Sequence, residues 1–268
     1  MDNNICFILC SCDSYEDLWV PFCTQLVKHW PEFDLPIYLS TETKSFRYDG
    51  LHIETPLKDS NTDLSSWSKR LVILLKNLPY DYLIFMLDDF LLTEDVDVKE
   101  VEKAYHIIKS DDKIGLIHLW PLISSNSNQR RRDNAVECQY PDFYLIKNKM
   151  PYRIMTQVSI WKKDYMLKVL RAHESAWHFE VRGTIRSRFL KEKVYAIKEK
   201  IMDYPEGGLI WRGKAVEERL NYYDQELIAG IINKRGVIKA GDSSAVTKRT
   251  PRNLSYLWNM LKSFSPKI

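Results

Sequence analysis

The sequence predicts an α/β fold in which helices flank a mixed, mostly parallel, Rossmann-like sheet. Short apolar runs alternate with longer segments of helical spacing over residues 1–120. Some of these runs are apolar at every position, as is typical of strands that are buried on both faces. With 268 residues, of which 45% are hydrophobic, the chain is long enough to bury a full core.

Apolar runs predict the strands, and apolar residues three or four positions apart predict the helices. In the front part of the chain the expected strands are 5–10, 36–40, 51–54, 82–87 and 114–120. The expected helices are 15–30, capped by Ser14 and stopped by Pro31, then 63–78 with its N-cap among residues 63–66, and 98–109. Because strands and helices alternate, we expect parallel strands with helices on both faces.

The pattern changes after residue 120. The polar and basic stretch 124–132 predicts a loop, and residues 205–208 predict a turn. The expected strands are 143–146, 154–161 and 194–197, and the expected helices are 163–172, 177–190, 221–233 and 253–264. No repeat or linker divides the chain, so we predict one domain.

Composition and termini exclude several classes of protein. Lys and Arg exceed Asp and Glu only by 39 to 36, and no nucleic-acid-binding motif is present, so we expect no nucleic-acid partner. From the polar start we expect no signal peptide, and we expect no membrane span because no run approaches ~18 apolar residues. Five cysteines without a CxxC spacing argue against a disulfide framework and a zinc site, which favours a cytoplasmic location.

The most informative motif is the apolar run 82–87 followed at once by Asp88-Asp89. Ligands of α/β sheets bind beyond the carboxyl ends of the strands. Two adjacent carboxylates there repel each other and are costly to desolvate, and a divalent cation resolves both problems. We therefore predict that Asp88 and Asp89 bind Mg²⁺ or Mn²⁺ together with a phosphate-bearing substrate. The alternative is a solvated Asp pair in a turn.

With these elements placed, the chain resembles GT-A glycosyltransferases, especially small bacterial enzymes of capsule, O-antigen or lipooligosaccharide biosynthesis. Three segments carry the resemblance: 7–15 with Asp17-Leu18-Trp19 after it, Trp67-Ser68-Lys69-Arg70, and Leu87-Asp88-Asp89-Phe90. The last of these resembles the metal-binding Asp-x-Asp motif of that family, except that its two Asp residues are adjacent. The resemblance implies a nucleotide-sugar donor, with UDP as the nucleotide, and Asp89 as the direct metal ligand. Many of these enzymes add a C-terminal His ligand, whereas here no His follows His178.

The resemblance also implies donor-binding residues in the front half. Ser11 and Asp13 correspond to the place where a uracil or ribose is held, and a plain N-cap role is the alternative. Trp67 belongs to the segment that resembles the helix beside the nucleotide. Arg70 could donate two hydrogen bonds to the diphosphate, although an Arg on a helix is often solvated or lies along the surface.

A general base is expected in the back half. Trp177 and Glu180 are three residues apart and share one face of a predicted helix. A ring that stacks on a sugar beside a carboxylate that accepts a proton suits an inverting sugar transfer, and the pair resembles the acceptor-site helix of inverting GT-A enzymes. We predict Glu180 as the base and Trp177 as an acceptor-binding residue, with Asp224 and Glu226 as second candidates for the base. The alternative is a first-turn Glu and a core Trp.

Two weaker motifs complete the candidates. Arg130-Arg131-Arg132 would suit the phosphates of an acceptor, or is simply solvated. Gly207, Gly208 and Gly213 would form a turn over the site, with Arg212 and Lys214 near phosphate, or a plain hairpin.

The expected function is that of a metal-dependent, inverting hexosyltransferase that acts on a glycan or lipid-linked acceptor. On this view residues 1–120 are the nucleotide-sugar-binding half, 121–248 the acceptor-binding half and 249–268 a C-terminal amphipathic helix. A nucleotidyltransferase that makes nucleotide sugars is one alternative, although such enzymes carry a Gly-rich loop where this chain has residues 11–15, which contain no Gly. A non-catalytic sugar-binding protein is the other.

The C-terminal segment has its own two interpretations. Lys248, Arg249 and Arg252 precede an apolar stripe at helical spacing: Leu254, Leu257, Trp258, Leu261 and Phe264. A basic cluster beside such a stripe suits peripheral contact with the anionic inner face of a membrane. Alternatively, the stripe closes the core.

Overall fold

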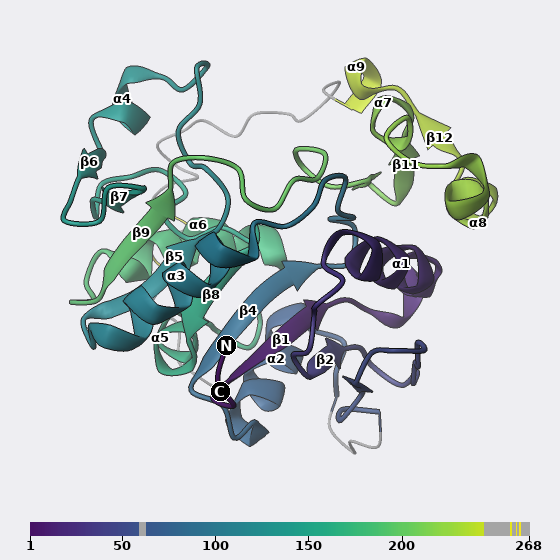
Figure 1. The fold of residues 1–268 in the computed structure, drawn as a ribbon, viewed down its shortest axis with the longest axis horizontal. Coiled ribbons are helices and arrows are strands. Elements are labelled where there is room, and N and C mark those ends of the chain that lie inside the picture. The colour runs from purple at the N-terminus through teal and green to yellow at the C-terminus, as the bar shows by residue number, and fades with distance from the viewer. Residues whose placement is uncertain (59–62, 244–257, 259–260, 262, 264–268) are drawn as a thin grey trace.

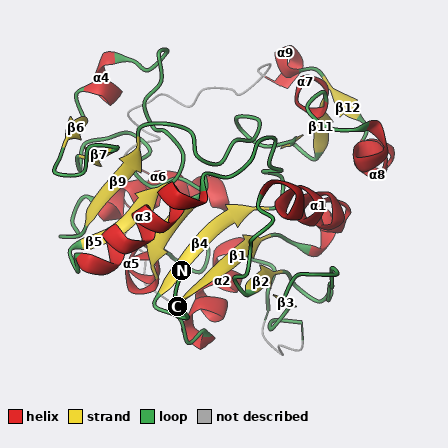
Figure 2. Cartoon of the chain, viewed as in Figure 1, coloured by secondary structure: helices red, strands yellow, loops and turns green. Residues whose placement is uncertain are grey.

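The structure is a computed structural model that describes residues 1–58 and 63–243 and, near the C-terminus, residues 258, 261 and 263. In this part of the chain, helices flank a nine-stranded mixed sheet (Figure 1), which confirms the predicted fold class. The strand order is β3 (Ile53–Glu54), β2 (Ile37–Ser40), β1 (Ile5–Cys10), β4 (Tyr82–Leu87), β8 (Ser159–Lys162), β5 (Ile114–His118), β9 (Lys193–Ile197), β7 (Phe143–Ile146) and β6 (Ala135–Glu137). The helices and the remaining strands are drawn in Figure 2.

Each face of the sheet is covered by its own hydrophobic cluster. In β1, Phe7 and Leu9 contribute to one cluster, and Cys6 and Ile8 contribute to the other. The first face is covered by α1 (Trp19–His29) and α3 (Val98–Ser110), and the second by α2 (Trp67–Asn77), α5 (Lys163–Val169) and α6 (Ala176–Ser187). Because side chains alternate along a strand, this two-sided burial explains why β1 is apolar at every position.

Strand β8 determines which residues reach the carboxyl edge of the sheet. It lies between β4 and β5 and is antiparallel to both, with Phe85 opposite Ser159. The residues that precede β8 therefore lie beside those that follow β4. This brings Thr156 and Gln157 near Asp88, although they are far apart in the sequence.

A smaller unit lies beyond the carboxyl ends of β1 and β4 (Figure 1). It contains a sheet of β10 (Ile210–Trp211), β11 (Lys214–Val216) and β12 (Val237–Ile238), with α7 (Glu217–Leu220), α8 (Gln225–Arg235) and α9 (Ala240–Ser243). Arg235, at the end of α8, donates two hydrogen bonds of 2.6 and 2.7 Å to Asp17. Its guanidinium also lies 4.1 Å from the centroid of the Tyr15 ring. This contact joins the small unit to the turn after β1.

Several local predictions were wrong. The expected helix 15–30 begins as a 3-10 helix, η1 (Asp13–Leu18), whose N-cap is Cys12 and not Ser14, because Ser14 lies inside that turn. The expected strand 154–161 begins only at Ser159. Part of the expected loop 124–132 forms α4 (Gln129–Arg132), because Asn128 caps it by accepting a hydrogen bond from the Arg131 amide. The expected helix 221–233 begins at Gln225 as α8.

Of the predicted C-terminal helix, the structure describes Trp258, Leu261 and Ser263, which are helical. Trp258 and Leu261 are exposed, and the backbone oxygen of Ser263 accepts a hydrogen bond from Arg186. The basic residues 248, 249 and 252 lie outside the described residues. Among the described helices, none is long and apolar enough to cross a bilayer.

Candidate active site

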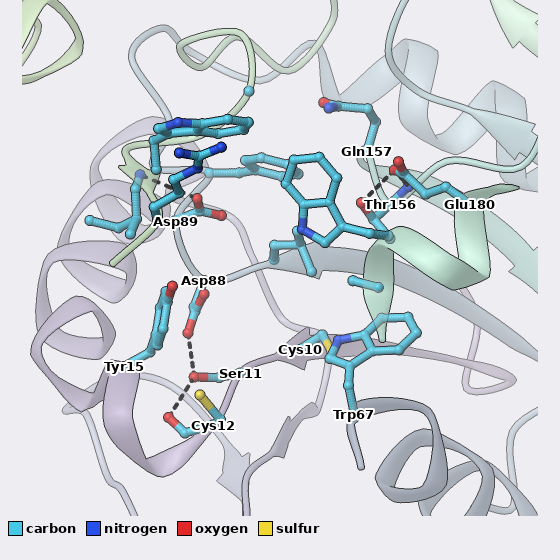
Figure 3. A pocket seen from close by; sticks show the side chains of 18 of the residues that line it. Cys10, Ser11, Cys12, Tyr15, Trp67, Asp88, Asp89, Thr156, Gln157 and Glu180 are labelled. Atoms are coloured by element: carbon cyan, nitrogen blue, oxygen red, sulfur yellow. Dashed lines mark hydrogen bonds between the residues drawn. The ribbon is translucent and has the colours of Figure 1, made fainter. Parts of the chain in front are cut away.

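A cavity of about 680 Å³ lies at the carboxyl ends of β1 and β4, between the large sheet and the small unit (Figure 3). Of the residues predicted for the site, it brings together Ser11, Trp67, Arg70, Asp88, Asp89, Trp177, Glu180, Gly207 and Arg212. Asp88 and Asp89 lie on one side of it, and Thr156, Gln157 and Glu180 lie on the other. The remaining lining residues are Cys10, Cys12, Tyr15, Leu87, Phe90, Ala176, Ile210 and Trp211.

Asp88 and Asp89 are both buried, with 5% and 9% of their surface exposed. Ser11 donates a hydrogen bond to Asp88 Oδ2 and itself accepts one of 2.7 Å from the indole nitrogen of Trp19. The Ile210 amide donates to Asp89 Oδ2 at 3.4 Å. In the described part of the chain, neither carboxylate forms an ion pair with a Lys or an Arg. Two buried carboxyl groups therefore adjoin one another with no Lys or Arg of the described residues in direct contact.

The electrostatic consequence is a pair of raised pKa values. Burial and then the charge of Asp89 raise the pKa of Asp88 well above its usual range. Burial raises the pKa of Asp89 to about 6, although the Ile210 amide and more distant arginines partly offset this. Perturbed acids of this kind, in a cavity, are typical of functional sites.

Gly208 closes one side of the Asp89 carboxylate. It has φ of +72°, and a Cβ at this position would lie 2.2 Å from Asp89 Oδ2. Arg219 holds the glycine segment in place by donating hydrogen bonds to the carbonyls of Gly207 and Gly208. The backbone thus approaches the carboxylate more closely than any residue with a side chain allows. The predicted hairpin follows this glycine segment. Strands β10 and β11 pair antiparallel, and Arg212 and Gly213, with φ of 51° and 80°, form the turn between them.

The donor set fits a divalent cation with an oxygen-rich substrate. Two unpaired carboxylates supply hard oxygen ligands, as Mg²⁺ and Mn²⁺ prefer. Within the described residues there is no group of three or more His, Cys, Asp or Glu side chains arranged to hold a metal. Further ligands would therefore come from the substrate and from water, which is the common arrangement where these ions bind phosphates.

Glu180 projects from the first turns of α6, where Ser175 caps the helix by accepting a hydrogen bond from the His178 amide. The amide and the hydroxyl of Thr156 donate to Glu180 Oε1 at 2.8 and 2.7 Å. Oε1 is therefore occupied, and Oε2 is the atom left for the cavity. Burial raises the pKa of Glu180, and the two bonds from Thr156 offset this only in part. The carboxylate is thus a stronger base than usual.

Aromatic rings surround the mouth of the cavity. Trp177 is 66% exposed, and its ring centroid lies 5.4 Å from that of Trp211 in an edge-to-face arrangement. Trp67 packs against Phe179, with 5.5 Å between ring centroids. An exposed indole ring such as that of Trp177 is suited to stacking on a sugar or a base.

Two predicted residues are engaged elsewhere. The carboxylate of Asp13 does not line the cavity, and it accepts hydrogen bonds from Thr41 and Thr43. Burial opposes ionisation, but these bonds outweigh it and lower the pKa of Asp13. Arg70 lines the cavity but is 4% exposed, forms an ion pair with Glu42 at 2.5 Å and donates to the Ser11 carbonyl at 3.2 Å. The candidates that are not among the cavity-lining residues are Asp13, Arg130, Arg131, Arg132, Gly208, Gly213, Lys214, Asp224 and Glu226.

Sequence analysis missed Thr156, Gln157 and Trp211 as site residues. The first two reach the site only because β8 is antiparallel between β4 and β5. For Trp211 a signal was available: it immediately precedes Arg212 and Gly213, in the turn predicted to cover the site.

No protein-family model matches this chain, and no curated protein matches its sequence. Solved structures do match it. A structure of Staphylococcus aureus TarS 1–349 is 11% identical with a TM-score of 0.52, over 97% of this chain and 80% of that one. A longer TarS structure is 9% identical with a TM-score of 0.53, over 98% of this chain and 49% of that one.

A third match is glucosyl-3-phosphoglycerate synthase from Mycobacterium tuberculosis in complex with Mn²⁺ and UDP-glucose. It is 10% identical with a TM-score of 0.45, over 89% of this chain and 81% of that one. The structural neighbours include GT-A glycosyltransferases. The chain has a GT-A-like fold.

Proposed function

We propose that this protein is a metal-dependent glycosyltransferase. It moves a sugar from a UDP-linked donor to a hydroxyl of a glycan or lipid-linked acceptor. The observation that carries the proposal is the arrangement of one cavity. An unpaired carboxylate pair lies on one side of it, and an oriented carboxylate with one free oxygen lies on the other. Sugar transfer from a diphosphate donor needs both features, because the leaving group is anionic and the acceptor hydroxyl must lose a proton.

Asp88 and Asp89 are the residues that would hold Mn²⁺ or Mg²⁺. When bound, such an ion supplies positive charge that stabilises the leaving diphosphate. Ser11 fixes the orientation of Asp88, and the Ile210 amide with Gly208 fixes that of Asp89. Trp67 and Tyr15 line the cavity and offer aromatic surfaces to the nucleotide.

Glu180 acts as the general base in this proposal. Its Oε2 accepts the proton of the acceptor hydroxyl while the hydroxyl oxygen forms a bond to the anomeric carbon of the donor sugar. The bond between that carbon and the diphosphate oxygen breaks, and its electron pair leaves with the nucleoside diphosphate. Attack opposite to the leaving group inverts the anomeric configuration. The raised pKa of Glu180 favours proton transfer to it.

The test is the release of UDP from UDP-glucose, UDP-galactose and UDP-N-acetylglucosamine, with Mn²⁺ and with a chelator, and with glycosides added as acceptors. We expect Mn²⁺-dependent release that acceptors accelerate. In Glu180→Gln, acceptor-dependent release should fall by about 10²–10⁴-fold, the usual contribution of a general base, while UDP binding persists. The exposed Glu94 provides the matched control, Glu94→Gln.

Three outcomes would contradict the proposal. Release that a chelator does not change would remove the role of the metal. A fall of less than about tenfold in Glu180→Gln would assign the base elsewhere, because it is well below the usual range. Release of pyrophosphate from a nucleoside triphosphate and a sugar phosphate would instead identify a nucleotidyltransferase.

A further inference from the structure

Tyr204 connects the carboxylate side of the cavity with the side that carries Glu180. Its ring stacks on Phe90, the residue after Asp89, with 4.6 Å between ring centroids and 12° between the planes. On its other side it stacks on Trp120 at 4.3 Å. The phenol oxygen accepts a hydrogen bond of 3.2 Å from the Val158 amide and donates one of 2.8 Å to Gln157 Oε1.

These bonds determine which end of the Gln157 amide faces a ligand. The phenol has one proton, and because its oxygen already accepts from Val158, that proton is directed to the amide oxygen of Gln157. The NH₂ group of Gln157, which lines the cavity, is therefore the end left for a ligand. The burial of Tyr204 raises the pKa of its phenol, so the phenol keeps this proton at neutral pH.

The same short segment orients Glu180 through Thr156, so two fixed polar groups lie on one wall of the cavity (Figure 3). One is a hydrogen-bond donor, Gln157 Nε2, and the other is a proton acceptor, Glu180 Oε2. A donor beside a base matches two neighbouring hydroxyl groups: one loses its proton, and the other accepts a hydrogen bond through its oxygen.

Trp177 and Trp211, at the mouth of the cavity, indicate a second property of the ligand. Trp177 offers an exposed flat surface, and Trp211 meets it edge to face. The indole nitrogen of Trp211 is buried and has no hydrogen-bond partner among the residues that the structure describes. A flat apolar surface next to an unpaired donor suits a ring that has one apolar face and oxygen atoms at its edge.

We propose that the acceptor is a pyranoside with two adjacent free hydroxyls, of which Glu180 deprotonates the one that reacts and Gln157 Nε2 binds the other. The ring of the acceptor stacks on Trp177, and Tyr204 is a positioning residue that acts through Gln157. This inference rests on the proposed function and names the substrate class of the same site. It excludes linear polyols and lone hydroxyls as preferred acceptors, because they lack either the flat face or the rigid neighbouring pair.

The experiment measures binding by saturation-transfer NMR in the presence of UDP and Mn²⁺. The probes are methyl α- and β-glycosides of glucose, galactose, mannose and N-acetylglucosamine, with ribitol and glycerol 3-phosphate as linear probes. We expect at least one methyl pyranoside to bind the wild type more tightly than either linear probe. Gln157→Ala should weaken that binding about tenfold, the effect of one hydrogen bond lost in a cavity.

Two further comparisons separate a positioning role from a structural one. Tyr204→Phe keeps the aromatic stack but removes the acceptor of the buried Val158 amide, so we expect a lower melting temperature. A positioning role predicts that this variant, while still folded, binds the pyranoside more weakly but binds UDP with Mn²⁺ as the wild type does. The monodeoxy glycosides of the bound sugar should include one that binds wild type and Gln157→Ala equally, because that analogue lacks the hydroxyl that Gln157 holds. Gln129→Ala and Tyr222→Phe are matched controls at exposed positions, and we expect both to bind as the wild type does.

The inference is overturned if no methyl pyranoside binds, if a linear probe binds best, or if Gln157→Ala binds the preferred glycoside as tightly as the wild type. These results leave the proposed function standing when the wild type still releases UDP from UDP-sugars in a Mn²⁺-dependent way. The opposite result is also informative. If pyranosides bind in a way that depends on Gln157 but the protein does not act on UDP-sugars, the subsite is supported and the proposed transfer is contradicted.

Discussion

Two groups of buried acids in this molecule differ in how their charge is balanced. Glu174 is 1% exposed, and Arg186 binds both of its oxygens, at 2.9 and 2.5 Å. Asp88 and Asp89 are almost as deeply buried, but among the described residues their carboxylates accept hydrogen bonds from a hydroxyl and a backbone amide and form no ion pair. The charge of Asp89 also disfavours ionisation of Asp88. The first group is complete within the chain. The second is not balanced by a Lys or Arg of the described residues, and we propose that a bound cation balances it.

The presence or absence of a counter-charge distinguishes buried acids that stabilise the fold from buried acids that bind a ligand. A buried charge without a partner is costly, so a paired group such as Glu174 is explained by the stability of the fold. Two adjacent carboxylates without a cationic partner, at the carboxyl edge of a sheet, lower the stability of the fold. Their presence is explained if a ligand supplies the positive charge. The comparison therefore predicts opposite effects of neutralising the two groups.

The largest effect on stability is expected at the paired group. Glu174→Gln leaves the guanidinium of Arg186 buried without its counter-charge and should lower the free energy of unfolding by about 3–5 kcal/mol, measured by urea denaturation. Glu94→Gln, at an exposed position, should change it by less than about 0.5 kcal/mol. A loss below about 1 kcal/mol in Glu174→Gln would break the comparison, because it lies below the cost of breaking a buried ion pair.

Neutralising the unpaired group should have the opposite sign. Without added metal, Asp89→Asn removes one of two adjacent buried charges, and we expect the free energy of unfolding at pH 7.5 to rise by about 1–3 kcal/mol. The size follows from a pKa raised to about 6. Asp34→Asn is the exposed control. Destabilisation by Asp89→Asn under these conditions would show that the charge is balanced within the chain.

The pH dependence of the free energy of unfolding tests the charge of Asp89 independently. Because the folded state raises the pKa of Asp89 to about 6, it binds more protons than the unfolded chain between about pH 4 and 6. The contribution of Asp89 to stability therefore falls as the pH rises through that window. The advantage of Asp89→Asn over the wild type should be near zero at pH 4 and reach its full value above pH 7. A constant difference across these pH values would contradict the raised pKa.

The smallest expected effect separates backbone strain from contact with the carboxylate. Gly208 and Gly213 both have positive φ, but only at Gly208 would a Cβ meet Asp89; at Gly213 nothing lies within 4 Å. Each change to Ala should cost about 1 kcal/mol of stability from strain. Only Gly208→Ala should also weaken the binding of UDP in the presence of Mn²⁺, because it displaces Asp89. Equal affinities of the two variants would show that Gly208 does not shape the site.

The sequence was sufficient for the front half of the fold because its elements depend on local patterns. Strand β4 and the carboxylates after it follow from one apolar run with an abrupt end, and α3 follows from its helical spacing. The start of α2 shows where local reasoning has less to offer. Ser66 occupies the N-cap position, but its hydroxyl bonds the carbonyl of Ala172 and not the helix.

The back half of the site depends on long-range pairing, which local patterns do not contain. No spacing in the sequence shows that β8 lies between β4 and β5, and this pairing places Thr156 and Gln157 in the cavity that the two carboxylates also line. For Arg70, the sequence suggested a role toward phosphate but could not show that Glu42 takes up its charge. The assignment of Glu180, Asp88 and Asp89 to their roles stays a prediction.

The central claim is that the unpaired carboxylates exist to bind a cation together with a nucleoside diphosphate. The direct measurement is calorimetric titration of UDP into the full-length protein with Mn²⁺ and with a chelator, for the wild type, Asp89→Asn and Asp34→Asn. We predict that Mn²⁺ strengthens UDP binding to the wild type and to Asp34→Asn by at least about tenfold, or 1.4 kcal/mol, and leaves Asp89→Asn unchanged. An equal gain in affinity from Mn²⁺ in Asp89→Asn and the wild type would contradict the claim.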